Sequence, residues 1–79
     1  MIKVYTAPNC PYCEALKRFL KENGILFEEL DVSKDPKVVT ELISKSNQAG
    51  VPVIDINGKI IVGFNREAII KALLIKEKH

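Results

Sequence analysis

The sequence of 79 residues has no long hydrophobic run and no N-terminal stretch of the kind that directs export. Its longest apolar runs, such as residues 60–62, are far shorter than the roughly 20 residues that a transmembrane helix needs, which excludes a membrane-spanning protein. The opening segment MIKVYTAP carries one lysine and no extended apolar stretch, so it does not resemble a secretory signal. We therefore expect a cytoplasmic protein.

The sequence also lacks a large excess of charges of one sign. Twelve Lys/Arg against ten Asp/Glu leave a net charge of +2, which is too small to favour nucleic-acid binding. Apolar residues make up 47% and charged residues 28%, a composition typical of soluble globular proteins. Because no linker, repeat or low-complexity segment interrupts the chain, we expect a single domain over residues 1–79, acting as a monomer.

Cysteine is scarce, and both cysteines lie together. Cys10 and Cys13 are separated by two residues, a spacing that fits a reversible disulfide at the start of a helix. The first can remain exposed as a nucleophile while the second lies one helical turn further on. Pro11 supports this placement, because proline suits the first helical turn and lacks an N–H that would be unpaired there. In a reducing cytosol such a pair is more often catalytic or metal-binding than structural.

Three other interpretations of the thiols stay open. A structural disulfide is possible, although closing so short a loop constrains the unfolded chain little. A zinc site is possible, although zinc takes about four ligands and the only histidine, His79, lies at the far end of the sequence. Two inert buried thiols are the third possibility. We expect no metal site and an inert His79.

Hydrophobic periodicity predicts four strands and three helices. The strands are expected over residues 2–6, 25–32, 53–56 and 59–62, the last two joined by a turn at residues 57–58. The helices are expected over residues 12–23, from 36 to about 46–47, and after 65. Asp35 and Asn65 are predicted N-caps, Gly24 a left-handed helix end, and residues 76–79 a frayed tail. The predicted apolar helix faces hold Cys13, Leu16, Phe19 and Leu20, then Val38, Val39, Leu42 and Ile43, then Ile69, Ile70, Leu73 and Leu74.

This β-α-β-α-β-β-α order predicts an α/β protein. Strand, helix and strand imply a parallel pair joined by a right-handed crossover, and the later hairpin adds antiparallel strands. We expect one mixed four-stranded sheet in the order 2-1-3-4, with helices on both faces. Glu28 and Glu29 are expected to protect the exposed edge of the second strand.

Four short motifs resemble those of a dithiol glutaredoxin in the thioredoxin superfamily: Tyr5-Thr6, Cys10-Pro11-Tyr12-Cys13, Val51-Pro52 and Gly63-Phe64. The resemblance extends from Lys3 to about Leu74. It implies a thioredoxin-like fold, thiol–disulfide exchange through a redox-active Cys10–Cys13 disulfide, and no bound cofactor. It also implies a cis peptide bond before Pro52, beside which a substrate pairs like an added strand.

Three departures bring the chain closer to the small glutaredoxin-like redoxins reduced by thioredoxin reductase, including the NrdH-redoxin type. Ala7 stands where glutathione-using members typically have lysine, and Gly50 where many have threonine. Residues 62–66, Val-Gly-Phe-Asn-Arg, replace the usual two glycines and acidic pair. Thioredoxin reductase is the favoured electron donor, and glutathione stays open as a co-substrate. The expected substrate is a disulfide-containing protein such as ribonucleotide reductase or a peroxidase.

Within the cysteine motif, Cys10 is the predicted nucleophile, because a helix N-terminus favours its thiolate. Cys13 is the predicted resolver, which attacks the mixed disulfide. Pro11 and Tyr12 are expected to support the site, and Tyr12 is either a substrate contact or an exposed aromatic. Lys17 is expected to be a solvated surface lysine rather than a long-range aid to the thiols.

Five residues further along are candidate substrate contacts: Val51, Pro52, Gly63, Phe64 and Asn65. Asn65 is expected to cap its helix, whose N–H groups would also suit a carboxylate. Phe64 is interpreted as core more than contact. Two other functions are kept as alternatives, a carrier that holds an iron–sulfur cluster between two subunits and a redox-inert interaction domain. The rigid Pro11 beside the ligand cysteine argues against the cluster.

Overall fold

The computed structural model of the chain describes residues 1–73, and the predicted Leu74, His79 and the tail over 76–79 lie outside them. The element order is β1 (Ile2–Thr6), α1 (Pro11–Glu22), β2 (Glu28–Asp31), α2 (Pro36–Ser46), β3 (Val53–Ile56), β4 (Lys59–Val62) and α3 (Arg66–Leu73). The four strands form one sheet in the order β2-β1-β3-β4. β1 is parallel to β2 and antiparallel to β3, and β3 is antiparallel to β4. The predicted mixed sheet and its strand order are confirmed.

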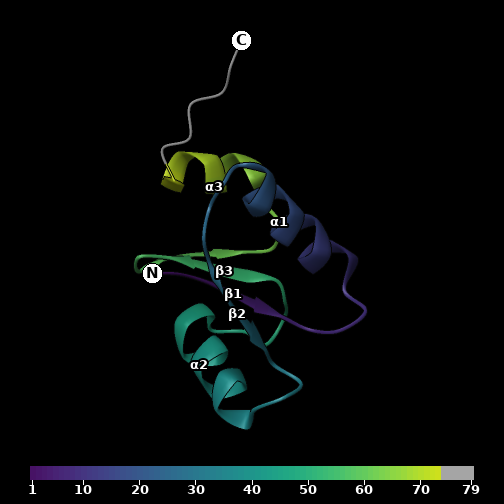
Figure 1. The fold of residues 1–79 in the computed structure, drawn as a ribbon. Helices are drawn as coiled ribbons and strands as arrows, with labels where there is room; N and C mark the ends of the chain where they lie inside the picture. Colours follow the sequence, from purple (N-terminus) through teal and green to yellow (C-terminus); the bar gives the residue numbers. More distant parts are fainter. Residues whose placement is uncertain (74–79) are drawn as a thin grey trace.

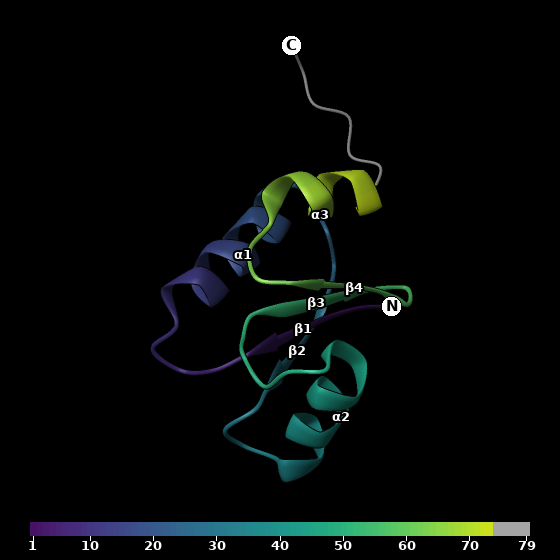
Figure 2. The ribbon, with the colours of Figure 1, turned by 180° about the vertical axis from the view of Figure 1, so that it is seen from behind.

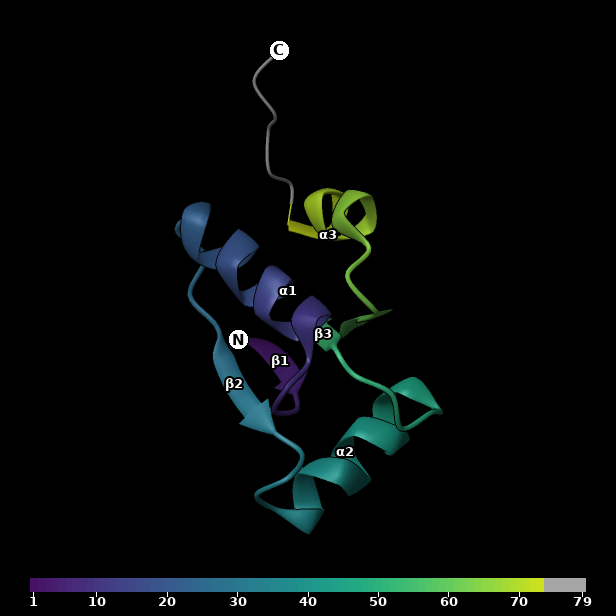
Figure 3. The same ribbon diagram turned by 90° about the vertical axis from the view of Figure 1, so that its right-hand side faces the viewer.

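The helices cover both faces of the sheet (Figures 1 and 2). α1 and α3 lie on one face and α2 lies on the other, as the side view also shows (Figure 3). Successive residues of β1 therefore face different layers: Val4 packs in the core beneath α1 and α3, and Tyr5 packs beneath α2. β3 is buried along its whole length because it is central and covered on both sides. No helix within residues 1–73 is long and apolar enough to cross a membrane.

The second strand is shorter than predicted, covering residues 28–31 instead of 25–32. The end of α1 explains the difference. Ile25 donates its N–H to the carbonyl of Leu20 at 2.9 Å, and Gly24 donates to Lys21 at 3.1 Å with a positive φ of 68°. This pair of bonds is a Schellman motif, so the backbone of Ile25 belongs to the helix end and not to the sheet.

The face of α2 that packs on the sheet also differs from the prediction. Leu42 is buried, but Ile43 is 44% exposed. The contacting stripe includes two polar residues, Glu41 and Lys45, which lie one turn apart and reach the side chains of the sheet. Ile43 follows the buried Leu42 and therefore lies about 100° around the helix axis from it, on the outer side of the helix.

The predicted caps are confirmed. Asp35 accepts a hydrogen bond from the N–H of Lys37 at 2.9 Å at the start of α2. Asn65 accepts one from the N–H of Ala68 at 3.1 Å at the start of α3. These caps fix where the helices begin, and the second one fixes the chain directly after β4, next to the candidate site.

Candidate functional site

The cysteine motif lies where β1 gives way to α1. Thr6 ends the strand, and Asn9 turns the chain with a φ of 58°, a left-handed conformation that asparagine tolerates. Cys10 is extended, with φ −115° and ψ 101°, and is the N-cap residue of α1. Pro11 is the first helical residue, as predicted. The sequence thereby places Cys10 at the mouth of the helix and Cys13 one turn inside it.

Cys10 and Cys13 form a disulfide with Cα atoms 5.2 Å apart. Cys13 has no exposed surface, whereas Cys10 is half-buried. The N–H of Cys13 donates to the sulfur of Cys10 at 3.2 Å. An N–H donor and the positive end of a helix both favour a thiolate at this position once the disulfide is reduced. Of the two sulfurs, that of Cys10 is therefore the more accessible and the better stabilised as an anion.

The Val51–Pro52 peptide bond is cis, as the resemblance implied. Pro52 is buried and directly precedes β3. The register pairs Val53 with Tyr5, so the start of β3 lies beside the end of β1 and close to the cysteine loop. Gly63 donates its N–H to the carbonyl of Pro52 at 2.8 Å. The structure thus brings the cysteine loop, the cis-proline and Gly63 to one end of the sheet.

The remaining predicted contacts surround this end. Tyr12 is 70% exposed, so it is open to a partner. Phe64 is half-buried and packs on the core, with its ring centre 5.9 Å from that of Phe19, in line with its interpretation as core. Asn65 caps α3 with its side chain, as described above. The guanidinium of Arg66 lies 5.3 Å above the ring of Phe19.

The expectation that Lys17 is a solvated surface lysine is wrong. Its side chain is only 17% exposed and its ammonium lies 2.5 Å from the carboxylate of Glu14 and 2.8 Å from that of Glu29. Hydrogen bonds to Glu14 and Glu29 raise the pKa of Lys17. The bond from Lys17 lowers the pKa of Glu29, which also accepts from the hydroxyl of Thr6 at 3.1 Å. Lys17 therefore joins α1 to β2 beside the strand end that leads to the cysteines.

Sequence reasoning missed this contact because Glu29 is 12 residues away from Lys17. One signal was available. Lys17 lies four residues after Cys13, on the same side of the helix as a buried residue. A lysine in that place must either extend to solvent or find a carboxylate, and β2 supplies one.

A second polar cluster lies on the opposite face, beneath α2. The hydroxyl of Tyr5 donates to the carboxylate of Glu41. Lys45 binds Asp55 at 2.6 Å and lies 5.4 Å from the centre of the Tyr5 ring. Burial, together with the bond to Glu41, raises the pKa of Tyr5. Burial alone would raise the pKa of Asp55, but the bond from Lys45, the bond from the N–H of Gly58 and the nearby lysine charges together lower that pKa. This cluster attaches α2 to the sheet and holds no reacting group.

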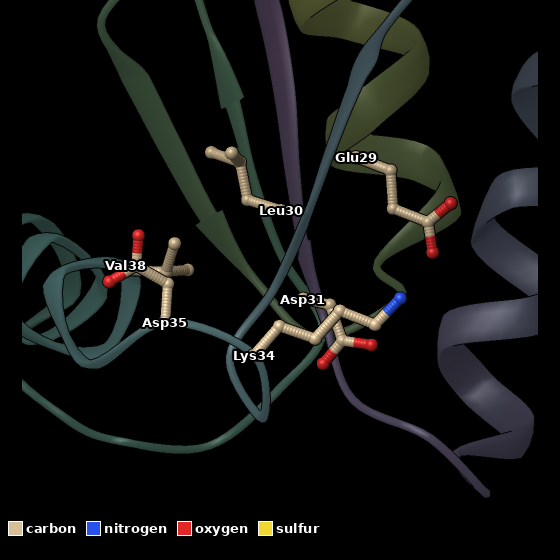
Figure 4. Close-up of a pocket in the computed structure, with 6 residues that line it drawn as sticks. All are labelled: Glu29, Leu30, Asp31, Lys34, Asp35 and Val38. Atoms are coloured by element: carbon tan, nitrogen blue, oxygen red, sulfur yellow. The ribbon is translucent and has the colours of Figure 1, made fainter.

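An open pocket of about 330 Å³ lies at the outer edge of β2, next to the start of α2 (Figure 4). Half of its lining residues are acidic: the pocket is lined by Glu29, Leu30, Asp31, Lys34, Asp35 and Val38. None of these side chains carries sulfur. Among residues 1–73, no group of three or more His, Cys, Asp or Glu side chains could hold a metal ion. The reactive chemistry of the described residues is therefore concentrated at the dithiol.

Comparison with known proteins agrees with this geometry. The Glutaredoxin family model matches residues 2–61. The chain belongs to the glutaredoxin family. A relative from Clostridium pasteurianum, described as an uncharacterized glutaredoxin-like 8.6 kDa protein in the rubredoxin operon, is 48% identical over 92% of this chain and 97% of its own. The glutaredoxin-like protein NrdH of Lactococcus lactis is 31% identical over 90% of this chain and 97% of its own.

Solved structures of relatives share the thioredoxin-like fold of this glutaredoxin. The thioredoxin-like protein BC3987 superposes with a TM-score of 0.86 at 36% identity, covering 91% of this chain and 99% of that chain. This glutaredoxin is thus a thiol–disulfide oxidoreductase whose redox-active group is the Cys10–Cys13 pair.

Proposed function

We propose that this glutaredoxin, a single domain over residues 1–79, is a cytoplasmic monomer that reduces protein disulfides with Cys10 as nucleophile and Cys13 as resolver. One observation carries the assignment. Cys13 is fully buried one turn inside α1, whereas Cys10 lies at the mouth of the helix. Only Cys10 can meet a disulfide on another protein without the helix unwinding.

The reaction takes two steps. The Cys10 thiolate attacks one sulfur of the substrate disulfide, and the other substrate sulfur leaves as a thiolate that takes up a proton. Cys13 then loses its proton and attacks the Cys10 sulfur, which forms the Cys10–Cys13 disulfide and releases the second substrate thiol. The substrate gains two electrons, and the protein loses two. Pro11 keeps the start of α1 rigid during both steps.

The substrate lies across the cis-proline. Val51 and Pro52 present the backbone with which an extended substrate segment pairs as an added strand. Gly63 leaves room beside the carbonyl of Pro52, and the exposed ring of Tyr12 contacts the substrate on the other side. Phe64 and Asn65 act less directly, by fixing the chain between β4 and α3.

The electron donor is a flavoprotein thioredoxin reductase, or a similar protein, in preference to glutathione. Ala7 offers no cation near Cys10, and Val62 carries a 51% exposed side chain where close approach to a tripeptide is needed. The side-chain Oδ1 atom of Asn65 already accepts a hydrogen bond from one N–H at the start of α3, which leaves fewer donors for a carboxylate. The 31% identical relative named NrdH fits this choice. The substrate is a disulfide enzyme such as ribonucleotide reductase or a peroxidase.

Turnover of a protein disulfide tests the assignment of the cysteines. Cys10→Ser should abolish activity, and Cys13→Ser should stop turnover after the mixed disulfide forms. Full activity in Cys13→Ser would show that the resolver is wrongly assigned.

The donor is tested separately, by running the assay once with glutathione and its reductase and once with thioredoxin reductase. Efficient turnover with glutathione alone would overturn the donor and leave the dithiol mechanism intact. Anaerobic purification addresses the iron–sulfur alternative, since a coloured protein with bound iron would favour a cluster carrier.

A further inference from the structure

One side-chain amide holds the segment between α2 and β3. The Oε1 atom of Gln48 accepts from the N–H of Gly50 at 2.6 Å, and its Nε2 atom donates to the carbonyl of Gly50 at 3.1 Å. Nε2 also donates to the hydroxyl of Ser46 at 3.1 Å, and that hydroxyl donates to the carbonyl of Leu42 at 2.7 Å. The amide of Gln48 therefore ties Gly50 at two points and connects it to the last turn of α2.

This contact depends on the absence of a side chain at position 50. A Cβ atom at Gly50 would lie 2.7 Å from the Oε1 atom of Gln48, which is closer than such atoms approach. The backbone of Gly50 is not in the left-handed region, so its conformation does not itself require glycine. A side chain at position 50 would displace the end of the flexible Gln48 side chain from these hydrogen bonds.

Among residues 50–52, the hydrogen bonds of Gln48 and Gly63 leave only the backbone of Val51 open. Both polar backbone groups of Gly50 are occupied by Gln48, and the carbonyl of Pro52 is occupied by the N–H of Gly63. Pro52 has no N–H. Within residues 1–73, the N–H and the carbonyl of Val51 make no hydrogen bond. Val51 thus presents one free donor and one free acceptor directly before the cis-proline.

We infer that Gln48 is a positioning residue that holds the backbone of Val51 in place for a peptide substrate. The inference rests on the proposed function, in which the segment around a substrate cysteine pairs with Val51. We call the two hydrogen bonds from the Gln48 amide to Gly50 the clamp. A glycine without this clamp samples many backbone conformations, and ordering one such residue on binding weakens association by about tenfold. Gln48 removes that penalty in advance and makes no contact with either sulfur.

Single-turnover kinetics of the pre-reduced protein test the inference without any reductase. A fluorogenic peptide disulfide is varied in concentration to separate the half-saturating concentration from the limiting rate. Gln48→Met keeps the length of the side chain and removes its hydrogen bonds. It should raise the half-saturating concentration about tenfold and leave the limiting rate unchanged. Gly50→Ala should do the same, because its methyl group displaces the Gln48 amide.

Two controls separate positioning from a general structural role. Bis(2-hydroxyethyl) disulfide has no peptide groups to pair with Val51, so its reaction rate should be the same in wild type and Gln48→Met. Ala49→Ser lies in the same loop and leaves the clamp in place, so it should behave as wild type. Equal losses with the peptide and the small disulfide would overturn the inference. So would an unchanged half-saturating concentration for the peptide in Gln48→Met.

Amide hydrogen exchange gives a readout that does not need turnover. In a Cys13→Ser protein joined to a cysteine peptide through Cys10, the amide of Val51 should be protected, and Gln48→Met should reduce that protection. If the wild type fails to reduce the peptide disulfide, the proposed function is wrong, and the exchange of Val51 alone decides the role of Gln48. Protection of Val51 that is equal with and without Gln48 would overturn it.

Discussion

Replacing Lys17 by methionine tests the link between α1 and β2. The change keeps most of the apolar stem and removes an ammonium that lies within 2.8 Å of two carboxylates. A hydrogen bond between charged groups contributes about 1.5–3 kcal/mol when shielded, and an exposed ion pair about 0.2–1 kcal/mol. Because the side chain of Glu29 is 45% exposed, solvent screening reduces the first figure. We expect Lys17→Met to lower the free energy of unfolding by about 1–2 kcal/mol at pH 7.

The pH dependence of this loss follows from the two pKa shifts. Glu29 has a lowered pKa in the folded protein, so its contribution is present above its unfolded pKa of about 4.3 and is lost as pH falls through the folded value. Lys17 has a raised pKa, so its contribution is present below about 10.4 and is lost as pH rises through the folded value. The difference between wild type and Lys17→Met should therefore be largest from about pH 5 to 10.

Urea unfolding of the oxidised protein, followed by far-ultraviolet circular dichroism, measures the difference at pH 7 and pH 3. Lys21→Met is the matched control, since Lys21 lies one turn further along the same helix and is exposed. It should change the free energy of unfolding by less than about 0.5 kcal/mol. If Lys17→Met lost as much stability at pH 3 as at pH 7, the contribution would come from packing and the electrostatic argument would be refuted.

Four further results are expected. Asp35→Ala should lower the free energy of unfolding by about 1 kcal/mol, and Asp35→Asn by much less, because asparagine also caps a helix; equal losses in a denaturant titration would contradict the cap. Tyr5→Phe should cost about 1 kcal/mol, since Glu41 loses its hydroxyl donor; a more stable variant in the same titration would show that the bond does not contribute. The alkylation rate of Cys10, with Cys13 replaced by serine, should have a midpoint below the free thiol value of about pH 8.5, and a higher midpoint would remove the role of the helix N-terminus. The reduction potential, measured against a glutathione buffer, should lie between about −270 and −150 mV, and a value above that range would be inconsistent with a glutaredoxin.

Local patterns were enough to predict most of the fold. The alternation in β1, the helical spacing of α1 and the Asn57-Gly58 turn each have a short-range cause, so their positions followed from the sequence. The strand order followed from the connections between these elements. The predicted bounds of β2 were wrong because the N–H of Ile25 is used in a hydrogen bond at the end of α1. The strand propensity of Ile25 gives no sign of that bond.

The site was predictable where its chemistry is carried by neighbours in the chain. The Cys10–Cys13 pair and the cap at Asn65 are of this kind. The ion pair between Lys17 and Glu29 was not, because it depends on how α1 lies across β2. The clamp made by Gln48 was missed for another reason. Side-chain bonds to backbone groups two residues away are recognised signals for Asn, Asp, Ser and Thr, and glutamine is not usually read in this way.

Mass spectrometry of a trapped mixed disulfide tests the central claim most directly. Reduced Cys13→Ser protein is mixed with a peptide disulfide, and the adduct is digested without reduction. The account predicts one peptide attached through Cys10, stable until a second thiol is added, and no adduct in Cys10→Ser. An adduct on Cys13 in Cys10→Ser, formed as fast as the adduct on Cys10, would contradict the assignment of the exposed sulfur as the nucleophile.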